Sequence, residues 1–95
     1  MACYVDKPEW EWRGKMWCHL LADNLSELHA FARQLGLKRE WFQSPPKSRY
    51  PHYDLTAAMR EVALSLGALP ADRRTIIEKA KTLRVELTPA QTSLF

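Results

Sequence analysis

The feature that most constrains the fold is a short apolar run that passes directly into a helix start. Residues 16–22 are too few for an independent helix and predict a buried strand. Asn24 follows as a helix N-cap, and Glu27, three residues later, completes a capping box. Apolar residues then recur at helical spacing as far as Gly36, which can end the helix in a left-handed conformation. We therefore expect a buried strand followed at once by a helix.

Two further segments are candidates for strands. Residues 3–5 are apolar and predict a short strand that ends at Asp6, and residues 9–15 predict a loop that leads to residues 16–22. So short a connection favours an antiparallel pair, because a parallel pair normally needs a longer crossover. Residues 37–43 fit either a third strand or a helical turn.

Proline and glycine positions divide the second half of the chain. Residues 44–51 contain three prolines and cannot form regular structure. A second helix is expected to begin near Asp54 or Thr56 and to stop at Gly67, and a third to begin at the cap Asp72. The expected buried residues are Met59, Val62, Ala63 and Leu66 in the second helix, and Ile76, Ile77, Ala80 and Leu83 in the third.

This order of elements predicts one α+β (or small α/β) domain. A two- to three-stranded sheet would pack against about three helices, because each element must bury one apolar face. Residues 1–84 would form the domain, and residues 85–95, which lack a sustained period, a loosely ordered tail. A chain of 95 residues, 46% of them hydrophobic, can bury such a core without disulfides.

The net charge and the cysteines bear on the kind of ligand and on the cellular location. A net charge of +3 permits contact with an anion such as a nucleotide, a nucleic acid or an acidic protein surface. Cys3 and Cys18 follow no secretory leader pattern, so the expected location is the reducing cytoplasm. No apolar run approaches the roughly 18 residues of a membrane span, so no membrane contact is expected.

The three histidines are the first candidates for chemistry. His19, His29 and His52 each lie beside another polar or reactive residue, and histidine titrates near neutral pH and commonly binds metals. If they meet in space, they could hold a divalent metal ion. Cys18 and His19 are neighbours in a strand and would face opposite ways, so they are not joint ligands. The alternative for each histidine is a structural role, bonded within the fold.

Two carboxylates complete the candidate catalytic set. His52 and Asp54 are two residues apart and could project the same way, although Asp54 fits a helix cap equally well. Asp6 ends the first strand, where it either presents a carboxylate to a ligand or only turns the chain.

Aromatic and basic side chains are interleaved between residues 38 and 53. This composition suits stacking on bases and contact with phosphates, although tryptophans also serve simply as packing residues. The candidate ligand-binding residues of this kind are Tyr53, Trp41, Lys38, Arg39 and Arg49. No phosphate-loop, dinucleotide-binding, zinc-protease or CxxC pattern is present, so no particular reaction is indicated.

Several short motifs resemble those of a known family. They are Tyr4-Val5-Asp6, Cys18-His19-Leu20 followed by Ala22-Asp23, Glu27-Leu28-His29, Trp41-Phe42-Gln43, His52-Tyr53-Asp54 and Gly67-Ala68. In this order, across residues 2–84, they resemble a family of small bacterial and phage proteins catalogued as a domain of unknown function. The resemblance implies a phage or prophage setting and one shared site, made of Asp6, His19, His29, Gln43, His52, Tyr53 and Asp54.

Two functions are compatible with these observations. The first is a small enzyme, such as a hydrolase, or a binding domain, whose His/Asp/Tyr pocket takes a nucleotide or another phosphate-bearing ligand. His52 would act as general base or metal ligand, and Asp6 or Asp54 would orient it or hold a divalent ion. The second is a non-catalytic phage or prophage protein that binds a host protein or nucleic acid. Steep salt dependence would mark a nucleic-acid binder.

Overall fold

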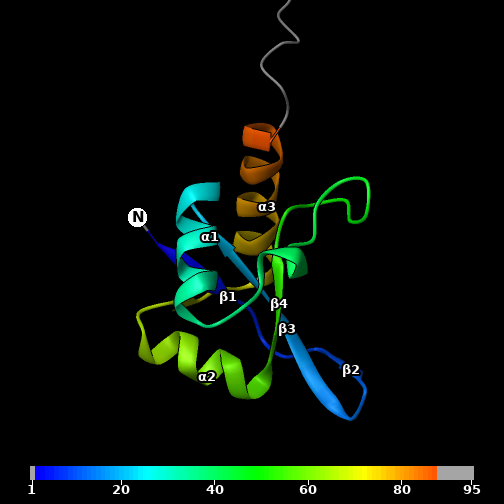
Figure 1. The fold of residues 1–95 in the computed structure, drawn as a ribbon, viewed down its shortest axis with the longest axis vertical. Coiled ribbons are helices and arrows are strands. Elements are labelled where there is room, and N and C mark those ends of the chain that lie inside the picture. The colour runs from blue at the N-terminus through cyan, green and yellow to red at the C-terminus, as the bar shows by residue number, and fades with distance from the viewer. Residues whose placement is uncertain (1, 88–95) are drawn as a thin grey trace, which may run out of the picture.

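The computed structural model describes residues 2–87, which fold into a mixed five-stranded sheet with helices on both of its faces (Figure 1). The elements in chain order are β1 (Cys3–Val5), β2 (Trp10–Trp12), β3 (Lys15–Ala22), α1 (Leu25–Gln34), the 3₁₀ helix η1 (Arg39–Trp41), β4 (Tyr53–Thr56), α2 (Ala57–Ser65), β5 (Leu69–Pro70) and α3 (Arg73–Leu87). The α+β prediction with three helices is confirmed. The prediction of two or three strands was too low.

The long strand β3 organises the sheet. β1 pairs antiparallel with its C-terminal half, β2 pairs antiparallel with its N-terminal half, and β4 pairs antiparallel with the opposite edge. β5 adds a short parallel strand beside β1. The antiparallel pairing expected for residues 3–5 is therefore confirmed. Because β1 and β2 share one edge of β3, the chain must leave that edge between them.

The loop predicted for residues 9–15 was wrong, because β2 and β3 form a hairpin there. Arg13 (φ 53°) and Gly14 (φ 75°) are both left-handed, the geometry of a two-residue turn that matches the twist of the strands. Residues 37–43 contain the 3₁₀ helix and, at Gln43, an isolated bridge to His52. Residues 44–51 form turns and bends, as expected.

Side-chain caps set the start of each helix. Asn24 Oδ1 accepts a hydrogen bond from Glu27 N at 2.8 Å, and Asp72 Oδ1 accepts one from Thr75 N at 2.9 Å, as predicted. The cap of α2 is Thr56, whose hydroxyl oxygen accepts from the backbone N–H of Met59 at 3.2 Å. Asp54 lies inside β4 and caps no helix, so its carboxylate remains available for other contacts.

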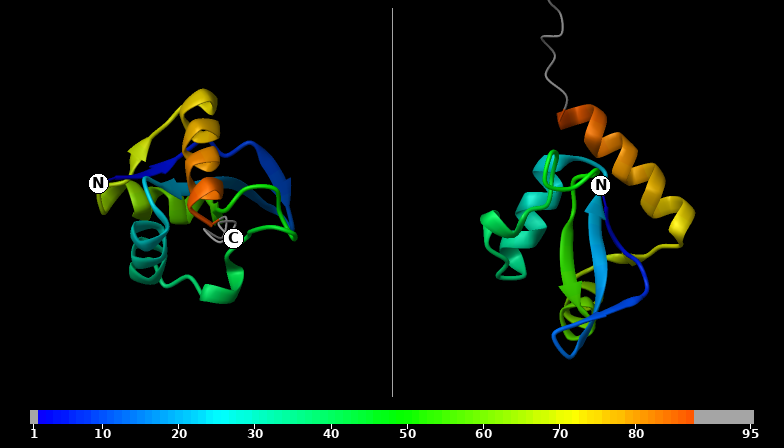
Figure 2. Two further views of the ribbon diagram at one scale, coloured as in Figure 1. Left: turned by 90° about the horizontal axis from the view of Figure 1, so that it is seen from above. Right: turned by 90° about the vertical axis from the view of Figure 1, so that its right-hand side faces the viewer.

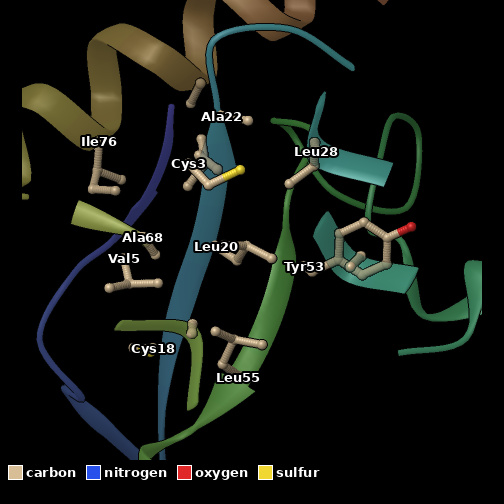
Figure 3. Packing of buried hydrophobic residues seen from close by; sticks show 14 of the residues in the cluster. Cys3, Val5, Cys18, Leu20, Ala22, Leu28, Tyr53, Leu55, Ala68 and Ile76 are labelled. Carbon is tan, nitrogen blue, oxygen red and sulfur yellow. The ribbon is translucent and has the colours of Figure 1, made fainter. Parts of the chain in front are cut away.

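The helices α1 and α3 lie on opposite sides of the sheet (Figure 2). In Figure 3, Leu28 of α1 and Tyr53 of β4 pack on one side of β3, and Ile76 of α3 packs on the other. Each helix buries a narrow stripe because the sheet is small. Val62, Leu66 and Ile77, predicted to be buried, are therefore 44%, 42% and 38% exposed.

The end of α3 lies inside the segment predicted to be a loose tail. The helix continues through Leu87, and Glu86 Oε1 accepts a hydrogen bond from Leu25 N at the start of α1, at 2.8 Å. The rest of the predicted tail, residues 88–95, lies outside the described residues.

Candidate metal centre

Three polar side chains meet on the face of the sheet that α3 covers. His19 of β3 and Asp54 of β4 are cross-strand partners, and His52 lies two residues before Asp54. Cross-strand partners share a face of the sheet, and so do residues two apart in an extended segment. One ligand atom from each residue lies within 4.8 Å of the other two. The ring centroids of His19 and His52 are 5.1 Å apart.

Both histidines are held through the same ring nitrogen. His19 Nδ1 is 2.7 Å from Asp6 Oδ2, and His52 Nδ1 is 2.8 Å from the carbonyl oxygen of Tyr50. A carbonyl or a carboxylate only accepts, so each neutral ring carries its hydrogen on Nδ1 and has its lone pair on Nε2. Metal-binding histidines are oriented by partners of this kind.

Asp6 occupies the gap that the chain leaves between β1 and β2. Its side chain is buried, Oδ1 accepts the backbone N–H of His19 at 2.7 Å, and the backbone oxygen of Asp6 accepts from Arg60 Nε at 2.7 Å. The carboxylate thus accepts the backbone hydrogen bond that a neighbouring strand would otherwise accept, and it fixes both the backbone and the ring of His19. Asp6, suggested by the sequence as a site residue or a turn former, is a positioning residue here.

Asp54 carries an unsatisfied oxygen. Asp54 Oδ1 is buried and has no hydrogen-bond partner among the described residues, although it lies 3.2 Å from His52 Nε2. With the hydrogen of His52 on Nδ1, two electron pairs face each other, which is unfavourable in a buried site. Either a second proton on His52 or a cation between the two atoms would relieve this contact. The residues present therefore fit a metal ion.

The electrostatic surroundings also favour a cation. Burial opposes protonation of His19, but the hydrogen bond and negative charge of Asp6, together with Asp54 and Glu9, outweigh burial and raise the pKa of His19 above its ordinary value. A tryptophan ring, Trp10, covers His19 with the ring centroids 4.7 Å apart. The cluster is thus negatively charged and partly shielded from water.

Two imidazoles and one carboxylate are a recognised ligand set for Zn²⁺ and related divalent ions. Catalytic zinc sites use three protein ligands and keep a fourth position for water or substrate. The three residues here supply that number. Such a site can bind an anionic oxygen or activate a water molecule.

Two pockets adjoin the cluster. His19 and His52 line one pocket of about 260 Å³, together with Arg49 and apolar residues of α3. Asp54 lines a second pocket of about 640 Å³, whose walls include three tryptophans. The two histidines of the cluster therefore adjoin one space that could receive a ligand, and Asp54 adjoins another.

The motifs in these strands and helices correspond to a recorded family. A family model described as "Protein of unknown function (DUF4031)" matches residues 3–83, from β1 into α3. The chain belongs to the DUF4031 family. The predicted resemblance to a family of unknown function is thereby confirmed. No curated protein and no solved structure matches the chain. In residues 2–87, no helix combines the length and the apolar character that a membrane crossing requires.

The third histidine of the DUF4031 protein lies elsewhere. His29 Nδ1 is 2.9 Å from the hydroxyl oxygen of Tyr53, and its ring packs edge-on against Phe42 at 4.6 Å between centroids. Tyr53 precedes Asp54 in β4 and so points to the α1 face, away from His52 and His19. The three histidines therefore do not form a single group: two meet, and His29 is bonded within the fold.

The environment of His29 has the opposite electrostatic effect. Burial and the positive charge of Arg39 lower the pKa of His29, and burial raises the pKa of Tyr53. Both groups therefore prefer their neutral forms. Arg39 lies over the ring of Phe42, on this side of the molecule, and not at either pocket beside the cluster.

Three of the other predicted ligand-binding residues line one of the two pockets, and Lys38 lies beside one of these three. The backbone of Gln43 pairs with that of His52 at 2.8 and 2.9 Å, and Gln43 also lines the larger pocket beside Trp41. Lys38 lies over the Trp41 ring, at 5.7 Å from its centroid. Arg49 lines the smaller pocket.

Sequence reasoning missed the contribution of the β2–β3 hairpin. Trp10 covers His19, and Trp12, Arg13 and Trp17 line the larger pocket. The available signal was the alternation of Trp10 and Trp12 just before Arg13 and Gly14, a pattern typical of a hairpin strand and its turn.

Proposed function

We propose that the DUF4031 protein binds a divalent transition-metal ion, such as Zn²⁺, through His19, His52 and Asp54, and that the ion holds a phosphate-bearing ligand. The observation that carries this proposal is Asp54 Oδ1, buried, without a hydrogen-bond partner among the described residues and 3.2 Å from His52 Nε2. A cation would satisfy both atoms at once, and Asp6 would keep Nε2 of His19 available as the third ligand.

The charges around the cluster support an anionic ligand. Arg49 lines the smaller pocket with His19 and His52, and Arg13 and Lys47 line the larger pocket with Asp54. A metal ion with three protein ligands can accept a phosphate oxygen or a water molecule in its open position. Hydrolysis of a phosphoester is therefore the reaction that such a site would best support.

The test is a zinc titration of metal-free protein, compared with the variant His52→Ala. We expect the parent protein to bind one equivalent of Zn²⁺ and the variant to lose this binding while its circular dichroism spectrum still shows a folded protein, because His52 contributes a ligand atom to the proposed site. Asp54→Asn, which keeps the shape and removes the charge, should also weaken zinc binding. Full zinc binding by His52→Ala, or none by the parent protein, would reject the proposal.

The same variants address the alternative function, a non-catalytic phage or prophage interaction protein. Binding of a nucleic acid that weakens steeply with salt and is unaffected by His52→Ala would favour that alternative. Binding of inorganic phosphate that requires both Zn²⁺ and His52 would favour the metal site.

A further inference from the structure

The larger pocket beside Asp54 has three tryptophans in its walls, and we call it the tryptophan pocket. It measures about 640 Å³ and is lined by Trp12, Trp17 and Trp41 with residues of the β2–β3 turn, β4 and the start of α2. Small-molecule sites commonly occupy between about 300 and 1,000 Å³. The pocket is thus large enough for a ligand that also reaches Asp54.

Two of the three tryptophans are left open to solvent. Trp12 is 53% exposed and Trp41 is 49% exposed, although large aromatic side chains usually bury most of their surface. Trp12 and Trp17 meet edge-on with centroids 5.7 Å apart. Flat aromatic ligands bury such surfaces by stacking, and every nucleobase has a face that can do so.

The pocket also carries positive charge. Arg13 lies 4.5 Å above the Trp12 ring, and Lys47 lines the pocket from the proline-containing segment. Asp54, one of the three proposed metal ligands, lies in its wall. A ligand that fits here would combine an aromatic ring with an anionic group that reaches the cations or the metal.

We infer that the phosphate-bearing ligand is a nucleotide whose base lies in the tryptophan pocket, with its phosphate directed toward Asp54 and the metal. This inference rests on the proposed function and names its substrate class. Trp41 and Trp12 contact the base, and Lys47 and Arg13 contact the phosphate.

The experiment compares three probes on the full chain loaded with Zn²⁺: adenosine monophosphate, ribose 5-phosphate and inorganic phosphate, each titrated by calorimetry. We expect the monophosphate to bind at least about 10-fold more tightly than ribose 5-phosphate, since stacking of one base on aromatic side chains commonly contributes this much. Trp41→Ala should remove that advantage and leave the affinity for ribose 5-phosphate unchanged. Trp41→Phe should retain most of it.

Two lysine variants show whether a local contact of Lys47 or only the net charge of the protein affects binding of the probes. Lys47→Ala should weaken binding of all three probes, whereas Lys81→Ala, on the exposed surface of α3, should weaken none. Equal affinities for adenosine monophosphate and ribose 5-phosphate, with no effect of Trp41→Ala, would overturn the inference.

The outcome also distinguishes this inference from the proposed function. If zinc and ribose 5-phosphate bind but the base adds nothing, the tryptophan pocket is not a base site and the metal proposal stands. If zinc does not bind, yet adenosine monophosphate binds metal-free protein through Trp41 and more tightly than ribose 5-phosphate, the base site stands and the metal proposal fails.

Discussion

The two faces of the sheet each hold histidine in a half-buried cluster, but the partners differ. On the α3 face, His19 and His52 lie among carboxylates, and Asp54 retains an unsatisfied oxygen. On the α1 face, His29 is paired with the hydroxyl of Tyr53 and lies against an aromatic ring. The pKa is raised at His19 and lowered at His29. The partner of a histidine, more than its burial, therefore separates a candidate ligand from a structural residue.

The largest expected effect is a loss of zinc affinity when a histidine is removed from the α3 face, with no loss when one is removed from the α1 face. His19→Ala removes a ligand, so we expect it to weaken Zn²⁺ binding by more than the roughly 100-fold upper range seen for loss of a positioning partner. His29→Ala should leave zinc affinity unchanged. Competition with a chromophoric chelator measures both. Equal losses in the two variants would show that the faces do not differ as described.

Removal of the positioning carboxylate should have the next largest effect. In Asp6→Asn, the amide oxygen can still accept the backbone N–H of His19, but the amide N–H₂ faces Nδ1 and forces the ring hydrogen onto Nε2. We expect zinc affinity to fall by about 10- to 100-fold. Asp72→Asn, which keeps the cap of α3, is the matched control and should bind zinc normally. An unchanged affinity in Asp6→Asn would remove the role given to Asp6.

A substitution on the α1 face should lower the free energy of unfolding and leave the zinc affinity unchanged. Tyr53→Phe deletes the partner of His29 in a buried position, and we expect a loss of about 1–2 kcal/mol in the free energy of unfolding with unchanged zinc affinity. Urea denaturation measures the loss. In the His29→Ala background the same change should cost clearly less, because the pair is already broken. Additive costs would show that the hydrogen bond contributes nothing.

The smallest effect is a difference in pH dependence between the two faces of the metal-free protein. His29 has a lowered folded pKa, so its unfolded form takes up the proton first and stability is lost as the pH falls below the ordinary histidine pKa. His19 has a raised folded pKa, so its contribution is fully present below the ordinary value and is lost as the pH rises through the folded pKa.

This difference can be measured as the pH dependence of the free energy of unfolding in glutamine variants of the two histidines. As the pH is lowered from 8 to 5, the stability difference between the parent protein and His19→Gln should grow in favour of the parent. The difference between the parent and His29→Gln should shift toward the variant. Parallel pH profiles in the two variants would contradict opposite shifts.

Local sequence patterns were sufficient to predict features that depend on a single helix or strand. Capping chemistry predicted the helix cap at Asn24. Strand alternation predicted that Cys18 and His19 point in opposite directions and that His52 and Asp54 point in the same direction. These patterns predicted most of the helices and two members of the cluster.

Relations between elements could not be predicted in this way. Whether His29 reaches the cluster depends on which face of the sheet α1 covers, and helical spacing alone does not specify that face. The two-residue strand β5 is too short to leave a pattern. The double contact of Asp6 with His19 arises only because β1 and β2 lie on the same edge of β3. Tertiary packing therefore completed the site.

The most direct test of this account is a ¹H–¹⁵N NMR spectrum of the histidine rings, recorded before and after one equivalent of Zn²⁺. We expect the Nε2 signals of His19 and His52 to shift strongly, with their Nδ1 atoms still protonated, and the signals of His29 to stay where they were. Unchanged signals of His19 and His52, or a zinc-induced shift at His29 instead, would contradict the assignment of the metal centre to the α3 face.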